Sequence, residues 1–74
     1  MSTDTNITEA LVANVSSLLR TRSVLAVSRA TGLSLKTVYR YRSGERLPRI
    51  DDLVRIASYF DVTPADLLHI GGDQ

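Results

Sequence analysis

Residues 32–44 combine a helix pattern with side chains that can bind a polyanion. Ser34 can cap the free N–H groups of a first helical turn, and Gly44 suits the left-handed residue that ends a helix. At 100° per residue, Val38 and Tyr41 fall on one side and form a narrow buried stripe. The other side is largely cationic, aromatic and hydrogen-bonding, and it carries Leu35, Lys36, Tyr39, Arg40 and Ser43. Such a face is typical of a helix that lies in a DNA groove.

Charge is unevenly distributed along the chain, although its net charge is only +1. Between Arg20 and Arg49 there are eight basic residues and one acid, Glu45. Outside that window, seven acids accompany Arg55 as the one basic residue. A charge-balanced protein with a basic middle presents one face to a polyanion and a neutral or acidic face elsewhere. The alternative, a solvated run of charges, would normally include both signs.

Two helices are predicted before this stretch. Apolar residues recur at three- and four-residue steps over residues 7–21, which indicates an amphipathic core helix. Asn6 and Glu9 resemble a capping box at its start. A short second helix is predicted over residues 24–31, with Ser23 as its cap. Two short helices joined by a tight, glycine-containing turn form a helix-turn-helix, so the helix at 34–43 is its second member.

Two more helices are predicted after it. Pro48 favours a loop, which we expect Leu47 to anchor in the core. A fourth helix is expected over residues 50–60, with acids in its first turn. Thr63 and Pro64 then begin a fifth helix that carries Ala65, Leu67, Leu68 and Ile70.

Length and composition limit the class of protein. Seventy-four residues suffice for one domain, expected over residues 7–70 between flexible tails at 1–6 and 71–74. The absence of cysteine excludes disulfides and thiolate metal sites. No apolar run approaches the length that spans a bilayer, and the N-terminus lacks the pattern of a secretion signal. We therefore expect a soluble, cytoplasmic protein.

The order of the helices and the residue types along them resemble the Cro/C1-type (XRE-like) helix-turn-helix phage repressor family. The resemblance covers roughly residues 8–69 and rests on Ser28, Gly32, Leu33, Ser34, Val38, Tyr41, Gly44, Pro48, Leu53, Ala57, Val62 and Leu67. It implies an all-α, five-helix lambda-repressor-like DNA-binding domain with the helix-turn-helix at helices 2 and 3. It also implies a transcriptional regulator of phage or bacterial origin, usually a repressor, that binds double-stranded DNA as a homodimer on a two-fold operator.

The resemblance also implies roles for individual residues. Leu35, Lys36 and Arg40 match the positions that touch base edges in the family. Contacts to the DNA backbone are implied for Ser23, Ser34, Tyr39, Arg42, Ser43, Arg46 and Arg49. The guanidinium of Arg40 can match the two acceptors of guanine, and such a pair discriminates between bases by ~1–3 kcal/mol.

Two positions depart from the family pattern. Val24 replaces the usual glutamine, so one side-chain contact to phosphate is missing, although the amides behind Ser23 can still hold a phosphate. Arg42 replaces the usual glutamate, so the buried ion pair with an arginine from the first helix is expected to be absent. Arg42 then has two alternatives, which are to face DNA or to pair with another acid.

Other classes of function have weaker support. His69 is the only histidine, and Ser16 and Ser17 have no base at a suitable spacing, so we expect no enzyme. Asp51 and Asp52 suit a helix N-terminus better than a metal site, and no cofactor or small-molecule ligand is expected. The rivals to a repressor are a protein-interaction module that has lost DNA binding and an antitoxin. A dimer surface is expected around Tyr59, Val62, Leu67, Leu68 and Ile70.

Overall fold

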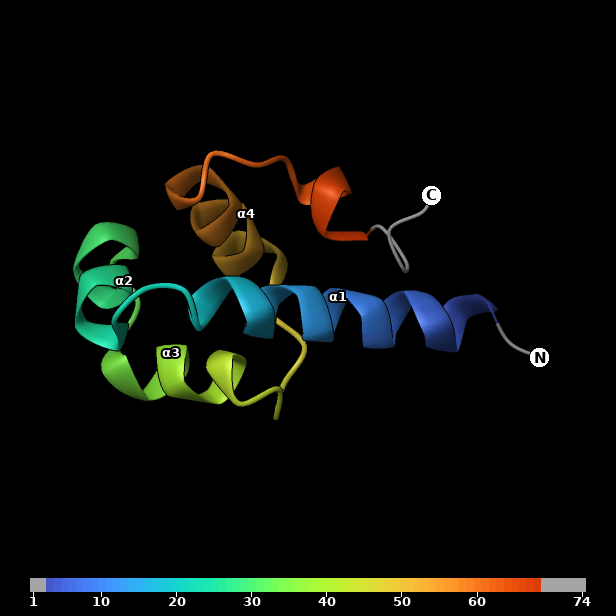
Figure 1. Cartoon of the computed structure of the whole chain (residues 1–74), viewed down its shortest axis with the longest axis horizontal. Helices are drawn as coiled ribbons and strands as arrows, with labels where there is room; N and C mark the ends of the chain where they lie inside the picture. The colour runs from blue at the N-terminus through green and yellow to red at the C-terminus, as the bar shows by residue number, and fades with distance from the viewer. Residues whose placement is uncertain (1–2, 69–74) are drawn as a thin grey trace.

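A computed structural model describes residues 3–68 of the chain, and this range is helical with no strand (Figure 1). The elements in chain order are α1 (Thr3–Leu19), α2 (Val24–Thr31), α3 (Leu35–Arg42), α4 (Ile50–Tyr59) and the 3-10 helix η1 (Pro64–Leu68). The predicted all-α class is confirmed. Where a fifth α-helix was predicted, the described residues instead form one short 3-10 helix.

The start of α1 differs from the sequence prediction. The described part of α1 already includes Thr3, so Asn6 lies inside the helix and the predicted capping box with Glu9 is wrong. Threonine and aspartate are also favoured at helix starts, so Thr3 and Asp4 provide an earlier start that competes with Asn6. The far end of the chain leaves two predictions untested, because Ile70 and the tail at 71–74 lie outside the described residues.

The 3-10 helix η1 is short, and hydrogen bonds between residues close in sequence set where it begins. The backbone N–H of Asp66 donates to Thr63 Oγ1 at 3.1 Å, and Asp66 Oδ2 accepts from the backbone N–H of Thr63 at 3.0 Å. This reciprocal pair is the predicted capping by Thr63, with Pro64 at the first helical position. Leu67 is buried and ties the segment to the core, whereas Leu68 is 43% exposed.

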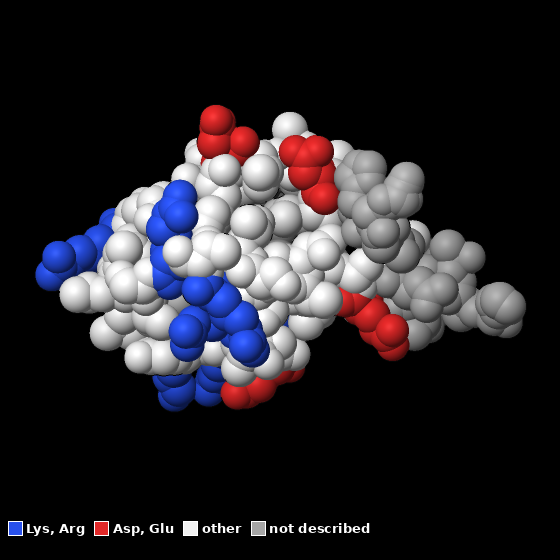
Figure 2. All heavy atoms as spheres, viewed as in Figure 1, with Lys and Arg blue, Asp and Glu red and all other residues white. Residues whose placement is uncertain are grey.

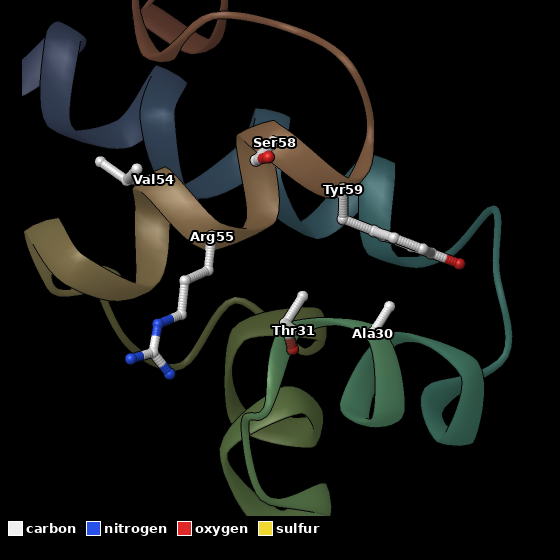
Figure 3. A pocket seen from close by; sticks show the side chains of 6 residues that line it. All are labelled: Ala30, Thr31, Val54, Arg55, Ser58 and Tyr59. Carbon is white, nitrogen blue, oxygen red and sulfur yellow. The ribbon is translucent and has the colours of Figure 1, made fainter.

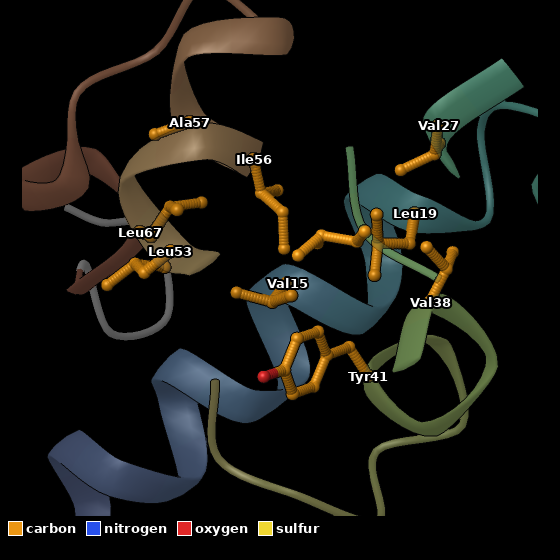
Figure 4. Close-up of a cluster of buried hydrophobic side chains, with 10 residues drawn as sticks. Val15, Leu19, Val27, Val38, Tyr41, Leu53, Ile56, Ala57 and Leu67 are labelled. Carbon is orange, nitrogen blue, oxygen red and sulfur yellow. The ribbon is translucent and has the colours of Figure 1, made fainter. Parts of the chain in front are cut away.

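The core lies where α1 meets α3 on one side and α4 with η1 on the other (Figures 1 and 4). The largest fully buried side chains are Val15, Leu19, Val27, Val38 and Ile56. In Figure 4, Val15 and Leu19 of α1 point between Ile56 of α4 and the pair Val38 and Tyr41 of α3. The predicted buried stripe of α3 is therefore confirmed, and it holds that helix against α1.

The turn between α2 and α3 is held by side chains of α2. Gly32 adopts φ 81°, which ends α2 in the left-handed conformation. Ser28 Oγ donates to the Leu33 carbonyl oxygen at 2.5 Å. Thr31 Oγ1 accepts from the Leu33 N–H at 3.2 Å and donates to the Val27 carbonyl oxygen at 2.7 Å. Because Leu33 and Thr31 are both buried, the turn fixes the angle between the two helices.

The end of α3 is a Schellman motif. The Glu45 N–H donates to the Arg40 carbonyl oxygen at 3.1 Å, and the Gly44 N–H donates to the Tyr41 carbonyl oxygen at 3.2 Å. Gly44 has φ 79°, as its position in the sequence predicted.

We expect Gly44→Ala to lower the free energy of unfolding by about 1–2 kcal/mol, because an L side chain is strained in this conformation. An added Cβ would lie 3.7 Å from Val12 Cγ1, an ordinary contact, so the cost is conformational rather than steric. Gly44→Asn is the matched variant, since asparagine tolerates this conformation better. Urea unfolding should show a smaller loss for asparagine than for alanine, and equal losses would contradict this explanation.

Within the described residues, no single helix is long and apolar enough to cross a membrane. One bent pair, Ile7–Leu19 with Val24–Thr31 at 107°, passes the same length and composition test, and buried core helices of this kind do so too.

Candidate nucleic-acid interface

The side of α3 opposite the core is open to solvent. Leu35 is 46% exposed and Tyr39 55% exposed, so neither is a core residue. Lys36 and Ser43 are exposed, and Arg40 is half-buried. The structure therefore brings the three predicted base-contacting residues and Tyr39 to one face of an eight-residue helix.

Both helices of the motif begin with a serine cap. Ser23 Oγ accepts from the Ala26 N–H at 3.0 Å at the start of α2. Ser34 Oγ accepts from the Thr37 N–H at 3.1 Å at the start of α3. Both serines are exposed. These two positions, which were predicted to contact the DNA backbone, are therefore also the caps at which α2 and α3 begin.

The loop between α3 and α4 presents its cations outward but is anchored differently from the prediction. Arg46 and Arg49 are exposed, as expected. Leu47 is 48% exposed, so it does not anchor the loop. Pro48 is buried in its place. An apolar, conformationally restricted proline fills the core at this point and turns Leu47 to the solvent.

Tyr41 connects the exposed helix to the loop and to α4. Its hydroxyl donates to Asp52 Oδ2 at 2.5 Å and accepts from the Arg49 N–H at 3.5 Å. Burial, followed by the hydrogen bond to Asp52, raises the pKa of Tyr41 above its usual value of 10.0. A single phenol therefore fixes the position of Arg49 relative to α3.

This raised pKa predicts a loss of stability in alkali. The unfolded chain releases the Tyr41 proton near pH 10, whereas the folded chain holds it to higher pH. The stabilisation is therefore complete below about pH 10 and is lost as the pH rises through the folded pKa. Tyr41→Phe should remove this part of the decline and lower stability at neutral pH by about 1–3 kcal/mol. Tyr39→Phe is the control, because Tyr39 is 55% exposed. Urea unfolding between about pH 8 and 11 measures the stability of each variant, and Tyr39→Phe should lose stability in alkali as the wild-type protein does.

Arg42 lies at the flank of α3 nearest α1. It is half-buried, its Nε is buried without a hydrogen-bond partner, and within residues 3–68 no ion pair joins it to an acid. Its carbonyl oxygen accepts from Ser16 Oγ at 2.6 Å. The alternative in which Arg42 pairs with another acid therefore finds no support in the described part of the chain.

On the face shown in Figure 2, basic and acidic side chains lie mainly on different parts of the surface, as the sequence predicted. Figure 2 shows Lys and Arg side chains gathered over α2, α3 and the C-terminal end of α1. Acidic side chains lie mainly over the α4–η1 connection and the N-terminal half of α1, with a further group at the lower edge. The cationic side of the molecule is thus the side that carries α3.

Several residues that support the site were missed by sequence reasoning. Asp52 was interpreted only as a helix N-terminal acid, and the role of Ser16 against Arg42 was not foreseen. Asn14 Nδ2 donates to the Leu67 carbonyl oxygen at 2.7 Å, which ties η1 to α1. Each of these bonds joins residues on different elements, so no local pattern predicts it.

A hollow between α2 and α4 lies outside this face (Figure 3). It is lined by Ala30, Thr31, Val54, Arg55, Ser58 and Tyr59. None of these residues belongs to α3. Among residues 3–68, no group of three His, Cys, Asp or Glu side chains is placed to hold a metal ion.

The fold and this face define a helix-turn-helix protein in which α3 is the exposed second helix. A family model of the Cro/C1-type HTH DNA-binding domain matches residues 14–71, more than half of the chain. The chain therefore belongs to this family, and it is a DNA-binding protein of the transcription-regulator class. No significant match was found among curated proteins or among solved structures.

Proposed function

We propose that the protein binds a specific double-stranded DNA sequence by placing α3 in the major groove, and that it thereby represses transcription. The observation that carries this proposal is the exposed face of α3, whose cations have no acidic partner in residues 3–68. The hydrogen-bonded turn between α2 and α3, together with the buried side chains of Val38 and Tyr41, keeps α3 in place. The site of action would be the cytoplasm of a bacterial or phage-infected cell.

The three base-contacting residues would read DNA by different chemistry. Arg40 has a planar fork of donors that matches the O6 and N7 acceptors of guanine. Lys36, in the first turn, would reach a guanine or a phosphate as a flexible point charge. Leu35 offers no hydrogen bond, and its exposed side chain suits contact with a thymine methyl group.

Backbone contacts would hold the helix in register without reading sequence. The proposed set consists of Ser23, Ser34, Tyr39, Arg42, Ser43, Arg46 and Arg49. Ser43 Oγ already donates to the Arg40 carbonyl oxygen at 3.0 Å and to Glu45 Oε2 at 3.2 Å. The Ser43 hydroxyl is therefore less available for a hydrogen bond to DNA than the exposed side chains of Arg46 and Arg49 in the loop.

A homodimer on a two-fold operator follows from the small reach of one domain. One recognition helix contacts only a few base pairs, and two copies one helical turn apart double the contact. Of the surface expected for this contact, Leu68 is 43% exposed, whereas Leu67 is buried and belongs to the core. Tyr59 and Val62 are half-buried. The proposed dimer surface therefore consists of Leu68, Tyr59 and Val62, together with Ile70, which lies outside the described residues.

Selection of bound duplexes from a random DNA pool tests the proposal. We expect a two-fold consensus, with half-sites separated by about one helical turn. Binding should weaken steeply with salt, by roughly a thousandfold between 50 and 200 mM if a dimer neutralises about six phosphates. Absence of DNA affinity at low salt, for selected and scrambled duplexes alike, would overturn the proposal and favour a protein-interaction module or an antitoxin.

A further inference from the structure

The outward face of α4 combines two exposed apolar side chains with one acid and one base. Ile50 is 73% exposed and Val54 is 51% exposed, and they lie one turn apart along one edge of this face. Asp51 and Arg55 are exposed, also one turn apart, along the other edge. Contiguous exposed apolar side chains are typical of a surface that contacts a partner.

The two charged side chains of this face have no partner within the described chain. Among residues 3–68, neither Asp51 nor Arg55 takes part in an ion pair or a side-chain hydrogen bond. Their spacing of four residues would allow them to pair with each other, yet they do not. Arg55 instead extends from α4 beside the hollow between α2 and α4 (Figure 3). A free acid and a free base thus stand one turn apart next to an apolar edge.

This arrangement is complementary to itself when two copies meet with their α4 helices antiparallel. A two-fold axis in the plane between the helices, level with Leu53, brings Asp51 of each copy to the level of Arg55 of the other. The same axis makes Ile50 and Val54 of the two copies alternate along the apolar edge. A parallel two-fold pair would instead set the charged edge of one helix against the apolar edge of the other, which leaves charges unpaired.

We propose that two copies of the chain associate through Ile50, Asp51, Val54 and Arg55 as an antiparallel, two-fold symmetric pair of α4 helices. This inference rests on the proposed function, because it supplies a contact by which a homodimer assembles on a two-fold operator. It extends the dimer surface proposed above, since Tyr59 follows Arg55 by one turn on the same edge of α4. The α3 helix lies on the other side of α1 from α4, so this contact leaves both copies of α3 uncovered (Figure 1).

The hollow beside Arg55 gives the partner's acid a place. It is lined by Ser58 and Tyr59 of α4 and by Ala30 and Thr31 of α2, besides Val54 and Arg55. In the antiparallel pair, the first turn of the partner's α4 lies at this level, so its acid meets the Arg55 guanidinium partly withdrawn from water. A partly desolvated ion pair is stronger than a fully exposed one.

Charge reversal tests the pairing, with self-association measured by sedimentation equilibrium. We expect Asp51→Arg alone and Arg55→Asp alone each to weaken self-association about tenfold, because each variant brings like charges together across the axis. An equimolar mixture of the two variants should associate as tightly as the wild-type protein. In that mixture, position 51 of each copy faces the opposite charge at position 55 of the other. Damage to the fold of either variant cannot produce this rescue.

Further variants separate the pairing from general effects of charge and apolar surface. Glu9→Arg reverses an exposed acid of α1 and should leave self-association unchanged. Ile50→Ala and Val54→Ala should each weaken it about threefold to tenfold, because every truncation removes buried apolar surface twice in a symmetric pair. Leu25→Ala truncates an exposed leucine of α2 and should have no effect.

A mixture of Asp51→Arg and Arg55→Asp that associates no better than either variant alone would overturn the inference. So would wild-type protein that sediments as a single copy both free and on the selected duplex. The proposed function fails by a different result, which is the absence of DNA binding by the wild-type protein at low salt. Because Asp51 and Arg55 lie outside the proposed DNA contacts, their variants should prefer the same bases as the wild-type protein in each half-site.

Discussion

Replacing Arg40 with alanine is expected to weaken binding to the selected operator by about 1–3 kcal/mol per half-site, roughly fivefold to 150-fold. The reason is that a guanidinium paired with guanine supplies two hydrogen bonds that no other base pair accepts equally well. The Tyr41 and Val38 stripe behind α3 stays intact, so the helix itself should remain folded.

The decisive measurement is a second selection from the random pool with Arg40→Ala. One position per half-site should lose its preference while the others keep theirs. Arg55→Ala is the control for the loss of a positive charge, and it should leave the consensus unchanged. An unchanged consensus for Arg40→Ala would remove Arg40 from the residues that read bases.

The substitution with the largest expected effect on folding is Leu19→Ala, which should cost about 2–5 kcal/mol. Leu19 is fully buried, and it lies in the middle of the core near Val38 and Ile56 (Figure 4). A domain of this size has a total stability of only about 5–15 kcal/mol, so a large part of the population should unfold at moderate temperature.

Leu25→Ala is the matched control, because Leu25 is also helical but is 49% exposed. Its loss of stability should stay within about 0.5 kcal/mol, as for surface substitutions in general. Thermal unfolding followed by circular dichroism measures both variants. Similar losses for the two leucines would show that the core is not centred on Leu19.

Elements defined by neighbouring residues could be predicted from the sequence. Ser23 and Ser34 as caps, and Gly32 and Gly44 as left-handed ends, fix α2 and α3 within a few residues, and the structure agrees. The exposed face of α3 followed from helical periodicity alone. The start of α1 was predicted wrongly because residue types favoured at helix starts occur both at Asn6 and before it, and a local pattern does not choose between them.

Interactions between elements were beyond the reach of local patterns. The bond from Tyr41 to Asp52 joins α3 to α4, and the bond from Ser16 to Arg42 joins α1 to α3. The choice of Pro48 over Leu47 as the loop anchor likewise depends on the shape of the core around the loop. Residue type shows that such groups can bond, but the fold decides with which partner.

The hydroxyl of Tyr41 couples two parts of the molecule that would touch different parts of a duplex. It meets Asp52 at the start of α4 and the backbone of Arg49 in the loop. We expect a mutation at Asp52 to loosen Arg49 relative to α3 without altering any residue that is proposed to contact DNA. The lifetime of the proposed complex with DNA would then depend on a residue outside the proposed set of DNA contacts.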